Sequence, residues 1–160
     1  MTDSEKSVFD IDYLKYFNGG VKLIIFDIDD TLSAYKEEFP DNSIELLKRL
    51  SQNFKIVFFS NCSSARRDYL MKIGKQLDIY AVNNSYKPNC GEYVRLFKRF
   101  NVSGKDVLVI GDRVGIDLLG AHGANVSNRT LVEPYSEIFG GINHPSYLRF
   151  LRYIEKKFLL

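Results

Sequence analysis

Residues Val21–Tyr35, VKLIIFDIDDTLSAY, hold the features that decide the fold. The apolar run Leu23–Phe26 is of the kind found in strands that are buried on both faces. Three carboxylates and a hydroxyl group follow this run at once: Asp27, Asp29, Asp30 and Thr31. Negative charge gathered at the end of a buried strand costs free energy unless a positive group lies beside it. The stretch therefore predicts a buried strand that ends at a site for something positive.

The composition indicates one ordinary globular domain, residues 1–160. The formal net charge is only +2, which gives no reason to expect nucleic acid as a partner. The two cysteines, Cys62 and Cys90, have no metal-ligand spacing and do not look like a disulfide framework. Residues Met1–Asp10 are unlike a secretory signal, and no apolar run approaches the roughly 20 residues that span a bilayer. We therefore expect a soluble, intracellular (cytoplasmic) protein.

Short apolar runs alternate with segments of helical period along the chain. The predicted strands are Leu23–Phe26, Ile56–Phe59, Ile79–Val82, Val107–Ile110 and Thr130–Val132. The predicted helices include Ser64–Leu77 and Gly91–Phe100, and another that begins near Asn42, which has capping-box spacing to Glu45. Apolar strands separated by helices predict an α/β fold with a doubly wound parallel sheet. In such a sheet, ligands bind at the carboxyl ends of the strands.

Polar residues gather where the predicted strands end. The first strand ends in DIDDT, the second in SNCSS (Ser60–Ser64) and the fourth in GDRVGID (Gly111–Asp117), while Lys87-Pro88 follows the third. Carboxylates gathered with few compensating cations favour a hard divalent metal, most plausibly Mg²⁺. A lysine and backbone N–H groups at a strand-to-helix turn form an anion site. A metal beside an anion site predicts phosphoryl transfer.

The four motifs, in this order, resemble those of the haloacid dehalogenase (HAD) superfamily of aspartate-nucleophile phosphatases. The resemblance runs from about Val21 to Pro134 and implies the Rossmann-like HAD core with Mg²⁺ as cofactor. It implies that Asp27 is the nucleophile, and that Asp29 is first the general acid and then the general base. The implied metal ligands are the carboxylates of Asp27 and Asp112 and the backbone carbonyl of Asp29.

The same resemblance implies a set of substrate-binding residues. Ser60 and the N–H of Asn61 would hold phosphoryl oxygens, and Lys87 would pair with the phosphate and with the nucleophile. Thr31 would orient the loop of the first motif through its hydroxyl. Asp117 would contact the residues that bind the metal, or would contact the metal through a water molecule. Asp30 is expected to be structural or a surface charge.

Other classes of protein fit the sequence less well. A response-regulator receiver domain also gathers Asp, Mg²⁺ and Lys at strand ends, but its phosphorylated Asp follows the third strand, where this chain has NNSYKP. A catalytically silent binding module remains an alternative, although every motif position is filled. Neither cysteine begins the C-x5-R loop of cysteine phosphatases, because Asp68 and Leu96 stand where arginine is needed. His122 and His144 show no ligand pattern and are expected to be satisfied or surface histidines.

The spacing of the motifs leaves no room for a cap domain, since only about 30 residues separate Thr31 from Ser60. An open site suits a large substrate, a membrane-borne head group, or closure by another subunit of a homo-oligomer. Among capless HAD phosphatases, the chain resembles bacterial YqeG proteins and the phosphatidylglycerophosphate phosphatases of mitochondria and plastids, with Ile116 and Gly120–His122 as departures. This resemblance implies that phosphatidylglycerophosphate is dephosphorylated to phosphatidylglycerol in phospholipid metabolism. The alternative substrates are a sugar phosphate, a nucleotide phosphate or a phosphoprotein.

The last segment, Pro145–Leu160, is predicted to be an amphipathic helix. One side carries the apolar residues Tyr147, Leu148, Leu151, Ile154 and Phe158. The other side carries the charged residues Arg149, Arg152, Glu155 and Lys156. Two roles fit this pattern: peripheral contact with an anionic membrane through residues 145–160, or docking on the sheet edge or a neighbouring helix.

Overall fold

Six parallel strands form the centre of the computed structural model, which describes residues 2–82 and 86–159. Their order across the sheet is β1 (Thr2–Glu5), β6 (Asn128–Val132), β5 (Val107–Gly111), β2 (Leu23–Phe26), β3 (Lys55–Phe58) and β4 (Tyr80–Ala81). The strand that leads into the first motif of the chain, β2, is therefore central. Its Leu23 lies opposite Val107 of β5 and Lys55 of β3.

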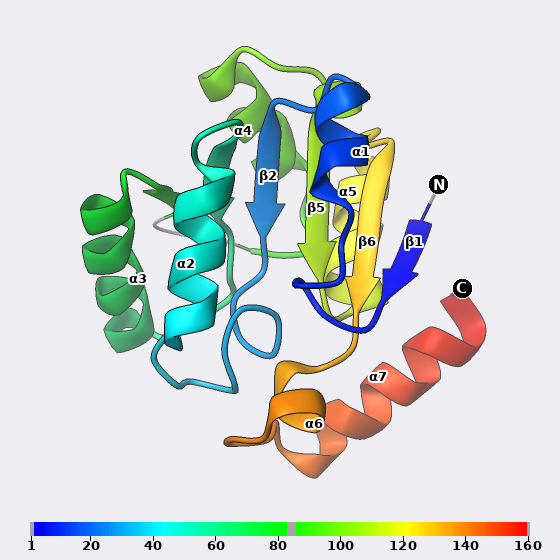
Figure 1. Cartoon of the computed structure of the whole chain (residues 1–160). Coiled ribbons are helices and arrows are strands. Elements are labelled where there is room, and N and C mark those ends of the chain that lie inside the picture. Colours follow the sequence, from blue (N-terminus) through cyan, green and yellow to red (C-terminus); the bar gives the residue numbers. More distant parts are fainter. Residues whose placement is uncertain (1, 83–85, 160) are drawn as a thin grey trace.

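Helices cover both faces of this sheet, which confirms the predicted α/β fold with a doubly wound parallel sheet (Figure 1). Apolar side chains of α1 (Tyr13–Asn18), α2 (Asp41–Leu50) and α3 (Ser64–Leu77) join one core cluster. Those of α4 (Cys90–Phe100) and α5 (Leu119–Gly123) join a second cluster. All side chains of β2 and β5 are buried between these layers, as apolar parallel strands require.

The sequence pattern located the core strands to within two residues but missed the edge strand β1. The residues of β1 are polar, because an edge strand has no need of a continuous apolar run. The strand is held instead by its ladder to β6 and by Tyr16, whose hydroxyl donates to Asp3 Oδ2 at 2.6 Å and lies 3.1 Å from Thr130 Oγ1.

The capping box predicted at Asn42 and Glu45 is wrong. Helix α2 begins at Asp41, and Pro40 occupies the N-cap position with no side-chain capping bond. Asn42 therefore lies inside the first turn, where its side chain accepts a hydrogen bond from the N–H of Ser43.

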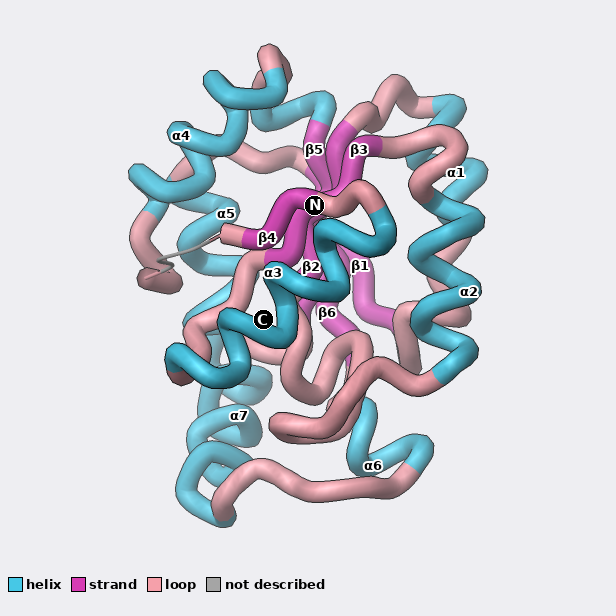
Figure 2. Tube along the Cα trace, turned by 90° about the vertical axis from the view of Figure 1, so that its left-hand side faces the viewer, coloured by secondary structure: helices cyan, strands magenta, loops and turns pink. Residues whose placement is uncertain are grey.

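Two C-terminal helices, α6 (Tyr135–Phe139) and α7 (Ser146–Leu159), lie across the carboxyl ends of the strands (Figures 1 and 2). Helix α7 does not dock through its predicted apolar side alone, because its charged residues Arg152 and Glu155 face the domain. Arg152 is only 6% exposed, whereas Tyr147 and Leu151 of the predicted apolar side are 64% and 44% exposed. The side chain of Phe158 lies outside the described residues. In the described part of the chain, no helix combines the length and apolar character that crossing a bilayer demands.

Candidate active site

The polar residues predicted at the strand ends meet in one cavity of about 220 Å³. They reach it from the ends of β2, β3 and β5 and from the loop after β4. The cavity is lined by Asp27, Asp29, Ser60, Asn61, Lys87, Asp112 and Asp117, together with His144 and Leu148 from the C-terminal segment, among other residues. The structure thus brings together seven of the eight predicted site residues around this cavity, and the eighth, Thr31, lies behind it against Asp27.

Lys87 is the central cation of the site. Its Nζ donates to Asp27 Oδ1 at 2.5 Å and also contacts Asp117 Oδ1, while its side chain is only 2% exposed. Burial opposes the charged form, but the carboxylates of Asp117 and Asp27 raise the pKa of Lys87 above its ordinary value. Lys87 is therefore a fixed positive charge between two carboxylates.

Asn61 fixes the position of Lys87 through the backbone. Its side-chain Nδ2 donates to the carbonyl of Lys87 at 3.0 Å, and its Oδ1 accepts from the N–H of Lys87 at 2.9 Å. These two reciprocal bonds tie the end of β3 to the loop after β4. The asparagine that follows Ser60 thus has a positioning role that the motif alone did not reveal.

Asp27 is held on both carboxylate oxygens. The buried hydroxyl of Thr31 donates to Oδ2 at 3.2 Å, and Lys87 holds Oδ1. The backbone N–H of Asp27 donates to Ile110 of β5 at 2.9 Å, so the sheet ladder continues to the site. This arrangement leaves the carboxylate in one orientation at the edge of the cavity.

Asp29 has a partner that sequence reasoning missed. Arg66, in the first turn of α3, donates through one guanidinium nitrogen to Asp29 Oδ1 at 2.9 Å and to Ser33 Oγ at 3.0 Å. The N–H of Lys36 also donates to Asp29 Oδ1, at 3.0 Å. Burial raises the pKa of Asp29 above its ordinary value, Arg66 opposes this shift, and Asp27 adds to it. A carboxyl group with a raised pKa is suited to carry a proton.

Three carboxylates form a cluster that could hold a metal ion: one oxygen each of Asp27, Asp112 and Asp117, all within 4.8 Å of one another. Hard oxygen donors of this kind fit Mg²⁺. Burial raises the pKa of Asp117, with Asp27 adding to the shift and Lys87 opposing it. Gly111 permits this packing, because a Cβ atom there would lie 2.5 Å from the Asp117 carboxyl group.

Helix α7 adds a second cation to this cluster. The guanidinium of Arg152 pairs with Asp112 and lies 3.8 Å from Asp30 Oδ2. Glu155, one turn further along the helix, pairs with Arg113 and accepts from the N–H of Gly115 at 3.2 Å. The C-terminal helix is therefore docked on the domain by charged contacts at the strand ends.

Asp30 is structural rather than a surface charge. Its side chain is 1% exposed, and Oδ1 accepts from the N–H of Ser136 at 3.0 Å. His144 Nε2 lies 3.4 Å from Oδ2 of the same carboxylate, and the His144 ring packs on Tyr35 with 4.1 Å between centroids. Asp30 thus joins the first loop of the site to the segment that carries α6 and α7.

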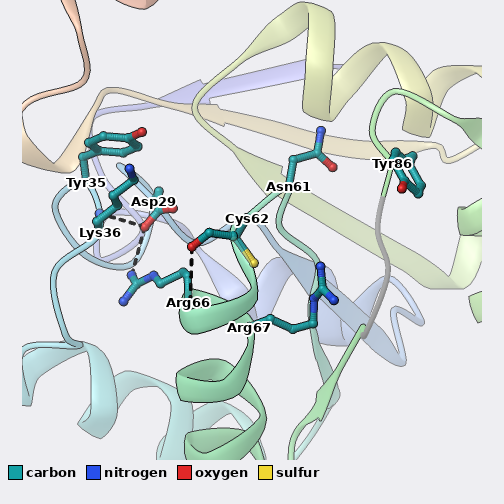
Figure 3. Close-up of a pocket in the computed structure, with 9 residues that line it drawn as sticks. Asp29, Tyr35, Lys36, Asn61, Cys62, Arg66, Arg67 and Tyr86 are labelled. Carbon is teal, nitrogen blue, oxygen red and sulfur yellow. Dashed lines mark hydrogen bonds and ion pairs between the residues drawn. The ribbon is translucent and has the colours of Figure 1, made fainter.

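A second and larger cavity, of about 450 Å³, adjoins the first (Figure 3). The two cavities share Asp29, Tyr35 and Asn61. The remaining residues that line the larger one are Lys36, Cys62, Ser63, Arg66, Arg67 and Tyr86. Burial raises the pKa of the Cys62 thiol, which opposes a role for this residue as a thiolate nucleophile.

Comparison with known proteins identifies a family for the sequence and related folds among solved structures. The sequence profile of the family described as mitochondrial PGP phosphatase matches residues 6–131. That range contains every predicted site residue and ends before α6 and α7. No curated protein gives a significant match to the sequence.

Solved structures with the same fold include several HAD proteins. A HAD phosphatase from Thermococcus onnurineus aligns with a TM-score of 0.55 at 14% identity, over 78% of this chain and 100% of that one. A haloacid dehalogenase-like hydrolase from Xanthomonas campestris aligns with a TM-score of 0.55 at 11% identity, over 86% and 99%. A HAD-superfamily hydrolase from Geobacter sulfurreducens aligns with a TM-score of 0.54 at 14% identity, over 74% and 98%. At these identities the likeness is one of fold.

Proposed function

Because the chain belongs to the mitochondrial PGP phosphatase family and is a phosphatase of the HAD superfamily, we propose that it hydrolyses a phosphomonoester through a covalent intermediate on Asp27. The observation that carries this proposal is the placement of Asp27 and Asp29 in one cavity, with Lys87 on the first and Arg66 on the second. Residues 1–160 would act as a single catalytic domain.

In the first half of the reaction, a carboxylate oxygen of Asp27 attacks phosphorus, and the bond from phosphorus to the leaving oxygen breaks. Asp29 donates its proton to that oxygen, which its raised pKa favours. Arg66 and the N–H of Lys36 keep the Asp29 side chain in place for this transfer. Lys87 compensates the negative charge of the nucleophile and of the approaching phosphoryl group.

In the second half, Asp29 accepts a proton from a water molecule as the water oxygen attacks phosphorus. The bond between phosphorus and Asp27 breaks, which releases inorganic phosphate and restores both carboxyl groups. Ser60 and the backbone N–H of Asn61 would hold phosphoryl oxygens throughout. Asp27, Asp112 and the backbone carbonyl of Asp29 would hold Mg²⁺, with Asp117 beside them. A bound Mg²⁺ would supply charge neutralisation between the nucleophile and the phosphate.

For the substrate, we propose phosphatidylglycerophosphate, which would be converted to phosphatidylglycerol. Two observations support a head group presented at a surface. The described residues between the motifs form no inserted cap, and exposed aromatic side chains cover the outer side of α7. Tyr147, Phe150 and Tyr153 are each at least 60% exposed, and they would allow peripheral contact with a membrane. A homo-oligomer that closes the site is compatible with the same open architecture.

A phosphate-release screen tests this proposal. Micellar phosphatidylglycerophosphate should be hydrolysed in preference to sugar and nucleotide phosphates, and Asp27→Asn should abolish release because an amide is a poor nucleophile. Asp29→Asn should cripple turnover but keep Mg²⁺ affinity, since the proposed metal contact of that residue is its carbonyl. Turnover of an aryl phosphate by Asp27→Asn at the parent rate would refute the covalent route. A preference for a soluble sugar phosphate would refute the lipid assignment.

A further inference from the structure

The larger cavity is lined by more cationic than anionic side chains. Lys36, Arg66 and Arg67 line it, and Asp29 is the only carboxylate among the described residues that do so. Figure 3 shows Lys36 and Arg66 on the side of Asp29, and Arg67 on the side of Asn61 and Tyr86. The cavity between these two sides is therefore positively charged.

The larger cavity lies where the leaving group of a bound substrate would extend. Asp29, which would protonate the leaving oxygen, lines both this cavity and the smaller one that contains Asp27 and Lys87. A phosphoryl group next to Asp27 therefore directs its leaving group past Asp29 and into the larger cavity. A volume of about 450 Å³ lies within the usual range for a small-molecule site.

Arg66 retains a donor that the protein does not use. The residue is 7% exposed, and one guanidinium nitrogen serves Asp29 and Ser33. Its Nε is buried and has no hydrogen-bond partner among the residues that the structure describes. A buried donor without an acceptor costs free energy, so an anion that accepted a hydrogen bond from it would gain binding energy. Ser63, the N-cap of α3, also lines the cavity and places the positive end of that helix there.

We propose that this cavity binds a second anionic group, a phosphodiester, carried by the leaving group of the substrate. The inference rests on the proposed function and deepens it, because it assigns Lys36, Arg66 and Arg67 to recognition of the part of the substrate that is not hydrolysed. A neutral leaving group such as glycerol offers nothing to these cations. A phosphodiester offers one negative charge and two acceptor oxygens, which suit guanidinium groups.

The test compares two soluble substrates on the full chain with Mg²⁺. One is glycerol 3-phosphate, whose leaving group is neutral. The other is glycerophosphoglycerol phosphate, whose leaving group carries the diester. We expect kcat/KM to favour the charged leaving group by about tenfold or more, and Arg67→Gln or Lys36→Gln to lower this ratio by about three- to tenfold, as expected for losing one partly exposed charge contact. Lys72→Gln, an exposed cation on α3 outside this cavity, is the matched control and should leave the ratio unchanged.

A second measurement needs no turnover. Glycerophosphoglycerol, the diester left after hydrolysis, should bind the unaltered chain in calorimetric titration, and more weakly in Arg67→Gln. If neither substrate releases phosphate, the proposed function fails, and this titration still decides the cavity assignment. Equal kcat/KM for the two substrates, an Arg67→Gln ratio equal to that of the parent, or no binding of the diester would each overturn the assignment. An Arg67→Gln effect seen with micellar lipid but absent with the soluble head group would also overturn it.

Discussion

Replacement of Arg152 by Met should destabilise the metal-free protein strongly. Arg152 is buried, and it is the one cation paired with Asp112 among the described residues. Removing one partner of a buried ion pair leaves the other charge uncompensated, at a cost of about 3–5 kcal/mol. For a protein of this size, each kcal/mol lowers the melting temperature by about 2–4 °C, so we expect a loss of roughly 6–20 °C.

The matched control is Arg149→Met on the same helix. Arg149 is 51% exposed and lies 3.7 Å from Glu137, so its loss should cost no more than about 1 kcal/mol. Both variants keep an apolar side chain of similar length, and they therefore differ in the burial of the charge that is removed. Thermal unfolding in the presence of a chelator, followed by circular dichroism, measures the melting temperature of each variant relative to that of the unaltered chain.

Binding of Mg²⁺ should restore much of the folding stability that the Arg152→Met variant loses. A ligand at one hundred times its dissociation constant stabilises the folded state by about 2.7 kcal/mol. In the unaltered chain, a metal on Asp112 competes with Arg152, so Mg²⁺ should raise its melting temperature less than that of the variant. Equal melting temperatures for the two variants in the chelator would refute the reasoning, as would a gain from Mg²⁺ that is no larger in Arg152→Met than in the unaltered chain.

Three further predictions concern the interior of the site. Arg66→Gln removes the cation that lowers the pKa of Asp29, so that pKa rises and the alkaline fall of kcat/KM should move to higher pH; a fall at the same or lower pH contradicts the assignment of Asp29 as the acid. Asn61→Ala removes both bonds to the Lys87 backbone and should lower kcat/KM by roughly 10- to 100-fold, whereas an unchanged value would show that Lys87 needs no such support. Tyr93→Phe removes the buried bond of 3.0 Å to the Asp117 carbonyl and should lower the free energy of unfolding by about 1–3 kcal/mol in urea titration, and an unchanged midpoint would argue against that bond.

The strands and the motif residues could be predicted because their signals are local. An apolar run followed by carboxylates marks a strand end in any parallel sheet, and the ends of such strands necessarily meet at one edge. Asp27, Lys87 and Asp112 therefore converge in the structure as their positions along the chain predicted.

The partners supplied by helices could not be predicted in this way. Arg66 lies in the first turn of α3, and no feature of the sequence separates it from the neighbouring Arg67; only the fold places its guanidinium on Asp29. Arg152 was placed on the charged side of its helix, and hydrophobic periodicity alone gives no reason for a charged side to face the domain. At this edge of the sheet the surface to be covered is carboxylate-rich, and a cation therefore faces inward instead.

The pairing of β1 with β6 has a consequence for folding during synthesis. In the finished sheet, Thr2 lies opposite Arg129, and Tyr16 bridges the two strands through Asp3 and Thr130. At about 5–20 residues per second, a ribosome needs roughly 6–25 s to make the chain between the two strands. The inner strands β2 and β3 are neighbours in both sequence and space. They can therefore pair during that interval, while the partner of β1 has not yet been synthesised. We therefore expect the sheet to be completed last at a strand that left the ribosome long before its partner.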